Sequence, residues 1–171
     1  TPHAAQDGRS PTPEALAAGI GLPPGAIGPH VPGVFEGGPR FLYIPVRDGG
    51  ALDTARPVEP HWSAIMDRAA IDSAYLYTMR GGHVTARMFS PTAGIPEDPA
   101  TGSAAAILSA QLLANRVLPD SGETRVTIAQ GTAMGRPSRI DLVIATHGGG
   151  LKTVHVTGSA VPVSTGRIRI P

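Results

Sequence analysis

The sequence predicts an α+β fold in which a barrel-like, mostly antiparallel sheet wraps around one central apolar helix. The first observation is a helical run over about residues 102–116 that is apolar on nearly every face, as expected of a helix enclosed by other structure. The second is a series of β-type runs before and after that helix. The third is the Gly-rich turn chemistry at 80–83 and 146–150, which is typical of connections between neighbouring strands.

The first 35 residues are rich in Pro and Gly, and we expect residues 1–35 to be a linker that enters a domain at residue 36. Thr12 as N-cap and Pro13 at the first helical position predict one short helix within this linker. The stretch after that helix can hold neither a long helix nor a central strand. Residues 36–171 are therefore expected to form the folded lobe.

Gly37 and Gly38 stand before a buried-looking strand at 40–46. Glycines there usually mark only a bulge or a turn, but they also allow backbone N–H groups to approach a ligand closely. Both glycines are therefore kept as weak candidates for binding. A short amphipathic helix is expected to follow, and its Trp62 is interpreted as a packing residue.

Two strands, at 74–79 and 84–89, are predicted to form a hairpin, with His83 exposed in its turn. After the central helix the sequence has five more β-type runs, at 125–129, 139–145, 153–157, 160–163 and 166–170. Enough strands are present to wrap one helix.

A loop rich in Pro, Gly and acid leads into the central helix. Pro99 cannot lie inside a helix and restrains Asp98 to an extended conformation, whereas Thr101 or Ser103 can cap the helix start. The first turn leaves free N–H groups from Gly102 onwards, which favour an anion together with the helix dipole. A lone Asp-Pro step is usually only a turn. An acidic loop that opens onto a buried helix favours a site instead.

Composition excludes several other classes of function. The 14 basic and 13 acidic residues predict no basic face for nucleic acid. The absence of Cys excludes disulfides, thiolate chemistry and Cys-based zinc sites, and the six scattered His have no helical pair, so we expect no metal. There is neither a serine-nucleophile elbow nor a phosphate-binding Gly-Lys loop. With no signal peptide and no membrane-spanning run, we expect a cytoplasmic protein without membrane contact.

Several strings resemble the PhzF-like phenazine-biosynthesis isomerases, a family similar in fold to diaminopimelate epimerase. They are Arg87-x-Phe-x-Pro, Gly94-Ile95, Glu97-Asp-Pro-Ala-Thr-Gly-Ser-Ala104, Gln130-Gly131, Met134-Gly-Arg-Pro-Ser138 and Val154-x-Val-x-Gly-x-Ala-Val161. The resemblance covers most of residues 36–171. It matches only the C-terminal half of the family pattern.

This resemblance implies an isomerase that needs no cofactor and moves a proton between carbons of a small, carboxylate-bearing substrate. It implies that Asp98 contacts and orients the polar groups of that substrate, so Asp98 is the candidate catalytic residue. Glu97 belongs to the motif but is interpreted as structural. The candidate substrate-binding residues are Gly102, Ser103, Thr101, Gly37 and Gly38.

The sequence departs from the family in one large respect. The family's principal acid/base is a glutamate in an N-terminal lobe, and neither Glu14 nor Glu36 stands in a matching context. We therefore expect the isolated chain to be inactive and to need that lobe as a partner. The face toward the absent lobe is expected to expose apolar surface, through which the chain dimerises. A non-catalytic module that binds small anions or another protein remains the alternative.

Overall fold

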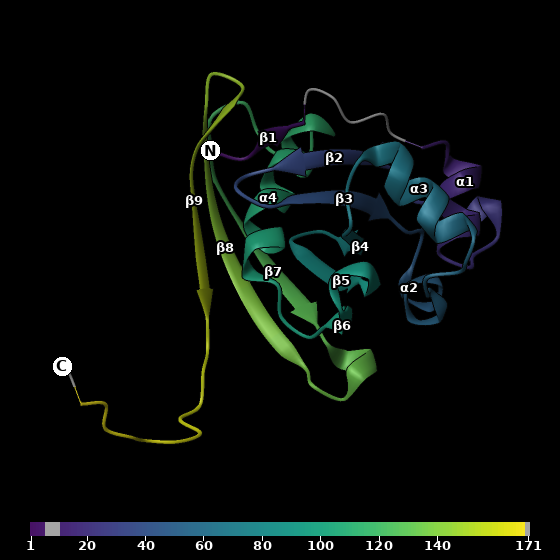
Figure 1. Ribbon diagram of the computed structural model, residues 1–171. Coiled ribbons are helices and arrows are strands. Elements are labelled where there is room, and N and C mark those ends of the chain that lie inside the picture. The colour runs from purple at the N-terminus through teal and green to yellow at the C-terminus, as the bar shows by residue number, and fades with distance from the viewer. Residues whose placement is uncertain (6–10, 170–171) are drawn as a thin grey trace.

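The computed structural model describes residues 1–5 and 11–169, and these form a curled sheet around one helix (Figure 1). The strands are β1 (His3–Ala4), β2 (Gly33–Glu36), β3 (Arg40–Pro45), β4 (Ala74–Arg80), β5 (His83–Ser90), β6 (Ile95–Asp98), β7 (Gly122–Gln130), β8 (Ser138–His147) and β9 (Gly150–Gly158). The α-helices are α1 (Pro13–Gly19), α2 (Gly49–Thr54), α3 (His61–Ala69) and α4 (Gly102–Ala114), and three short 3₁₀ turns lie at Pro24–Ala26, Pro91–Ala93 and Thr132–Met134.

The described strands form one sheet in the order β1-β2-β3-β4-β5-β7-β8-β9, with β6 paired to β5 beside this path. The β3–β4 and β5–β7 pairs are parallel and the other pairs are antiparallel. The strands curl around α4, which lies inside the sheet (Figure 1). The predicted α+β, barrel-like and mostly antiparallel architecture is therefore confirmed.

Helix α4 lies inside the curl, as Figure 1 shows, and it is buried along most of its length. Its apolar residues pack against inward-facing residues of β3, β4, β5, β7 and β8 in one hydrophobic core. Tyr43 of β3 reaches this helix and donates a hydrogen bond from its hydroxyl to the Ala104 carbonyl, at 2.7 Å. None of the described helices is long and apolar enough to cross a bilayer.

A second hydrophobic core lies on the outer face of β2–β5, where α1, α2 and α3 cover the sheet. Successive residues of β3 alternate between the two cores: Tyr43 faces α4, whereas Leu42 and Ile44 face the outer helices. This double burial explains why β3 does not alternate between apolar and polar residues from Phe41 onwards. Trp62 is fully buried in the outer core, which confirms its interpretation as a packing residue.

The expected linker at 1–35 is wrong for the part of it that the structure describes. Thr12 does cap α1, since its Oγ1 accepts from the Ala15 amide at 3.3 Å. However, Leu16 and Ile20 are fully buried in the outer core, and the expected boundary at residue 36 falls inside β2. Pro and Gly here shape turns between packed segments, so composition alone suggested a linker. Residues 6–10 of that prediction lie outside the described residues.

The short elements that were not predicted include α2 and β6. Helix α2 begins with a Gly-Gly step, and Asp48 caps it by accepting from the Ala51 amide at 2.9 Å. Strand β6 lies in the Pro-rich loop and pairs with β5 through Asp98 and Ile95. Elements of four to six residues are too short to show a hydrophobic period. The expected extended conformation of Asp98 is nevertheless confirmed by its place in β6.

The two strands predicted at 160–163 and 166–170 are not present among the described residues after β9. Residues 159–169 have no regular secondary structure and project away from the sheet (Figure 1). The final residue of the second predicted strand lies outside the described residues. Strand-like composition needs a neighbouring strand to pair with, and the described residues offer none to this segment.

Candidate functional site

The N-terminus of α4 opens to solvent although the body of the helix is buried. Thr101 is the N-cap residue, but its side chain does not cap the helix. Gly102 and Ser103 are exposed, and no described group accepts a hydrogen bond from the Gly102, Ser103 or Ala104 amide. Unpaired amides at a helix start attract anions, because the helix dipole adds partial positive charge there.

Asp98 ends β6 directly beside these amides and is half-buried. Its Oδ2 accepts a hydrogen bond from the Thr101 hydroxyl at 2.6 Å. Within the described part of the chain, its Oδ1 receives no hydrogen bond. The predicted residues Asp98, Thr101, Gly102 and Ser103 therefore lie together, with one carboxylate oxygen and several amides left unpaired.

Gln130, at the end of β7, lies beneath this loop and was not predicted as a site residue. It is 1% exposed, and its Nε2 donates to the Asp98 carbonyl at 2.8 Å and to the Thr101 hydroxyl oxygen at 2.9 Å. Its Oε1 accepts from the Thr101 amide at 3.3 Å and from the Tyr75 hydroxyl at 3.2 Å. Burial, and secondly the Asp98 carboxylate, raise the pKa of Tyr75, so this phenol stays a donor.

The signal for Gln130 is its place in β7, where it follows Val126 and Ile128 on the buried face. A long amide at a core position must find partners. Gly131 comes next with a φ of 79°, and a Cβ there would collide with the Arg136 carbonyl and lie 2.7 Å from the Pro99 carbonyl. Only glycine fits this position, so the Pro99 loop can sit closely against the end of β7.

Glu97 is held in a different way. Its two oxygens accept from Nε and Nη2 of Arg87, both at 2.8 Å, and both side chains are largely buried. Nη1 of Arg87 donates to three carbonyls at the end of α2, at 2.8–3.1 Å. The guanidinium also lies 4.7 Å from the centre of the Phe89 ring. Both Glu97 oxygens are used in fixing the loop, which agrees with a structural role.

A hollow of about 370 Å³ lies at the open end of α4. Its walls include Gly102 and Ala100 on one side and the facing ends of β8 and β9 on the other. Arg139 belongs to these walls, but its guanidinium is exposed and hydrogen-bonded to Asp141 at 2.9–3.2 Å. That hydrogen bond lowers the pKa of Asp141 and raises that of Arg139.

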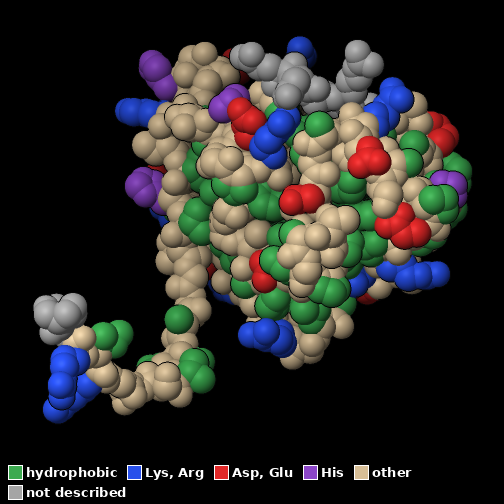
Figure 2. Space-filling model, in the orientation of Figure 1, with side chains coloured by type: hydrophobic (Ala, Val, Ile, Leu, Met, Phe, Trp, Pro, Cys, Tyr) green, Lys and Arg blue, Asp and Glu red, His purple; other side chains and the backbone are tan. Residues whose placement is uncertain are grey.

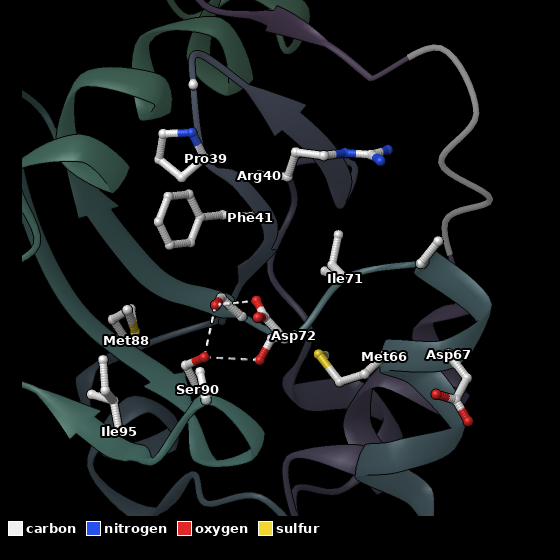
Figure 3. A pocket seen from close by; sticks show the side chains of 14 residues that line it. Pro39, Arg40, Phe41, Met66, Asp67, Ile71, Asp72, Met88, Ser90 and Ile95 are labelled. Atoms are coloured by element: carbon white, nitrogen blue, oxygen red, sulfur yellow. Dashed lines mark hydrogen bonds between the residues drawn. The ribbon is translucent and has the colours of Figure 1, made fainter.

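Of the two glycines before β3, Gly37 lies against α4, whereas Gly38 lines a different hollow. A Cβ at Gly37 would lie 2.9 Å from the Ile107 side chain, so Gly37 packs on α4 one turn beyond Ser103. Gly38 has a φ of 109° and lines another hollow of about 880 Å³ (Figure 3). None of the predicted residues of the 98–103 loop lines that second hollow.

The larger hollow lies between the start of β3, the end of α3 and the end of β5. Figure 3 shows the apolar side chains of Phe41, Met66 and Met88 around it, and Ser90 and Asp72 also line it. The Ser73 and Ser90 hydroxyls lie 2.8 Å apart, and Ser73 also donates to the Asp72 carboxylate at 2.7 Å. These hydroxyls tie the turn before β4 to β5. The described residues contain no cluster of His, Asp or Glu suited to a metal ion.

On the face of the molecule shown in Figure 2, basic and acidic side chains are interspersed, and no patch of one sign dominates. With a formal net charge of +1, this surface gives little long-range attraction to a polyanion. The unpaired amides at the start of α4 are therefore a local feature rather than part of an extended charged surface.

Residues 12–166 match the family model of the phenazine biosynthesis-like proteins. The chain is 35% identical over 167 residues to an uncharacterized isomerase of Mesorhizobium japonicum, and this alignment covers 92% of this chain and 55% of that protein. It is 32% identical over 134 residues to the trans-2,3-dihydro-3-hydroxyanthranilate isomerase of Pseudomonas aeruginosa, over 78% of this chain and 46% of that enzyme. The chain thus spans about half the length of these relatives.

Solved structures agree in fold. A PhzF-family phenazine biosynthesis protein of Bacillus anthracis superposes with a TM-score of 0.72 at 18% identity, over 94% of this chain and 58% of that one. A predicted epimerase of Pseudomonas aeruginosa gives a TM-score of 0.64 at 27% identity, over 96% of this chain and 57% of that one. From the family match and these relatives together, the chain belongs to the PhzF family of phenazine biosynthesis-like proteins.

Proposed function

We propose that this chain supplies the carboxylate-binding half of an isomerase site that needs no cofactor. The observation that carries the proposal is the meeting of unpaired α4 amides with an unpaired oxygen of Asp98 in one loop. The amides of Gly102 and Ser103 would bind the substrate carboxylate. Asp98 would accept a hydrogen bond from a neighbouring polar group and orient the substrate for proton transfer.

Proton transfer between carbons needs an acid/base within hydrogen-bond reach of the proton, directly or through one water. Within the chain, the Glu nearest in sequence to the site is Glu97, and Arg87 occupies both of its oxygens. We therefore propose that the family's acid/base glutamate comes from an N-terminal lobe, and that the substrate lies between that lobe and α4.

The test compares the 171-residue chain alone with the same chain joined to an upstream PhzF-type lobe. The substrate is trans-2,3-dihydro-3-hydroxyanthranilate, for which relatives of this chain are named. We expect turnover only when the lobe is present, and loss of turnover when the glutamate of that lobe is replaced by Gln. Rapid turnover by the isolated chain would refute the proposed division of the site.

A non-catalytic anion-binding module is the second candidate, because the chain spans only about half the length of its relatives. It predicts that small carboxylates bind at α4 but that restoring a lobe produces no turnover. The same pair of samples therefore separates the two functions.

We also propose that the isolated chain self-associates. Val161 and Val163 are 80% and 93% exposed, and Ile168 is 93% exposed, so the segment after β9 presents unpaired apolar side chains. Sedimentation velocity should show dimers whose population grows with protein concentration. Replacing Val161 and Val163 by Ser should return the chain to a monomer, whereas Val31→Ser, at another exposed position, should change nothing. A monomer at all concentrations would contradict this.

A further inference from the structure

We propose that Gln130 is a positioning residue for Asp98, acting through the hydroxyl of Thr101. The proposal rests on the proposed function, since it concerns how Asp98 is presented to a ligand. It begins from two backbone groups whose hydrogen-bonding roles cannot change. The Asp98 carbonyl can only accept and the Thr101 amide can only donate.

These two groups fix the orientation of the Gln130 amide. The nitrogen must face the Asp98 carbonyl, 2.8 Å away, and the oxygen must face the Thr101 amide, 3.3 Å away. In the opposite orientation, the Gln130 oxygen would face the Asp98 carbonyl oxygen, and the Gln130 nitrogen would face the Thr101 amide. Each pair would then consist of two acceptors or two donors. At 1% exposure no solvent is at hand to relieve such a mismatch.

The orientation of Gln130 then fixes the hydroxyl of Thr101. The second N–H of Gln130 points at the Thr101 hydroxyl oxygen, 2.9 Å away, so that oxygen accepts. A hydroxyl has one proton, and here the Asp98 Oδ2 at 2.6 Å receives it. Asp98 is therefore held as an acceptor at Oδ2, and Oδ1 is the oxygen presented to a ligand.

Tyr75 also forms a hydrogen bond with the Gln130 amide, but it does not help to orient the Thr101 hydroxyl. Its hydroxyl donates to Oε1 of Gln130 at 3.2 Å, on the side of the amide that faces away from Asp98. Removing it leaves both backbone groups in place, so the amide keeps its orientation. Tyr75→Phe is thus a matched control: it removes one hydrogen bond of the Gln130 amide but leaves the orientation of that amide unchanged.

The experiment uses four single variants of the chain. Thr101→Val removes the hydroxyl, and Thr101→Ser retains it. Gln130→Glu keeps the shape but replaces the donating nitrogen by oxygen, so that the Thr101 proton has two acceptors to choose from. Tyr75→Phe is the control, and thermal melting of all samples reports any general loss of fold.

The first readout is the χ1 rotamer of Asp98, from three-bond scalar couplings between its Cγ and backbone N and C′. We expect one rotamer in the wild type, Thr101→Ser and Tyr75→Phe, and averaged couplings in Thr101→Val and Gln130→Glu. A role in stability alone would lower the melting temperature of Thr101→Val and leave Asp98 in one rotamer. A single Asp98 rotamer in all variants would overturn the proposal.

The second readout is affinity for 3-hydroxyanthranilate, an aromatic analogue of the substrate named for the relatives. We expect affinity to fall about tenfold in Thr101→Val and Gln130→Glu, as for loss of a charge-assisted hydrogen bond, and to stay within about threefold in the other two. Averaged rotamers with unchanged affinity would overturn the proposal. If the wild type binds no probe while the rotamers respond as expected, the proposed function fails and the positioning of Asp98 stands.

Discussion

The two ends of α4 are built differently. At the C-terminal end, Asn115 closes the helix: its Nδ2 donates to the Gln111 carbonyl at 2.9 Å, and its Oδ1 accepts from the Val31 amide at 2.6 Å. The next residue, Arg116, adopts a left-handed φ of 57°, which lets the chain turn back and the Val117 amide donate to a helical carbonyl. At the N-terminal end, by contrast, no described group caps the first amides.

The open end is nevertheless not loose. Gln130 fixes the backbone on both sides of Pro99, Gly131 lets the loop pack against the end of β7, and the Arg87–Glu97 pair fixes the start of the loop. Among the described residues, the first amides of α4 and one oxygen of Asp98 have no hydrogen-bond partner. A helix end that is rigidly built yet uncapped is suited to a ligand, because binding need not order it.

The largest expected effect is on turnover. Asp98→Asn in the two-lobed protein should lower kcat about 1000-fold, or roughly 4 kcal/mol of activation free energy, because the unpaired oxygen can become an amide nitrogen that only donates. The melting temperature should change little. Asp120→Asn, at an exposed loop position, is the control. If Asp98→Asn turned over like the control, Asp98 would be only a loop residue.

Next in size is loss of the anchor beneath the loop. Arg87→Met should lower the free energy of unfolding by about 3 kcal/mol, since it leaves a largely buried Glu97 without a cation. Urea denaturation measures this. The control is Arg125→Met, whose pair with Glu123 is mostly exposed, and which should cost less than about 0.5 kcal/mol. Equal costs would show that Arg87 is no anchor.

A smaller effect is expected at Gly131. Gly131→Ala should cost about 2 to 3 kcal/mol, because left-handed strain adds to the collision with the Arg136 and Pro99 carbonyls. Gly148→Ala has a similar φ of 58° but open space around it, so it should cost only about 1 kcal/mol. The first variant should also shift the amide NMR signals of residues 99–103. Identical costs would mean that the close approach does not matter.

The smallest effect is at the closed end of the helix. Asn115→Ala should lower the free energy of unfolding by about 1 kcal/mol, the usual net value of lost hydrogen bonds at a partly exposed site. Affinity for 3-hydroxyanthranilate should not change. A variant that lost affinity together with stability would show that the two ends of α4 are not independent.

The elements with strong local signals could be predicted from the sequence. The all-apolar run predicted α4 as an enclosed helix, and the Gly-Gly step after Arg80 predicted the β4–β5 hairpin, with Gly81 at a φ of 57°. The acidic loop and the free amides after Thr101 placed the candidate site at the start of that helix. These features depend on neighbours within a few residues, so sequence patterns contain them.

The rest depends on contacts between distant residues. Gln130 lies about thirty residues from Asp98 in sequence, and nothing local distinguishes it from any other polar residue at a strand end. Leu16 and Ile20 were assigned to a linker because the sheet face that buries them is formed by later strands. The strands expected at 160–163 and 166–170 have suitable composition but no partner strand among the described residues.

The position of α4 in the chain order has a consequence for biosynthesis. Strands β7, β8 and β9 help to enclose α4, and all three follow it in the sequence. Strands β5 and β7 pair in parallel, and α4 lies in the segment that connects them. At about 5–20 residues per second, a ribosome presents the apolar helix several seconds before its cover is made. A newly made chain therefore exposes its most apolar segment during that interval, and chaperone demand should be greatest while β7 to β9 emerge.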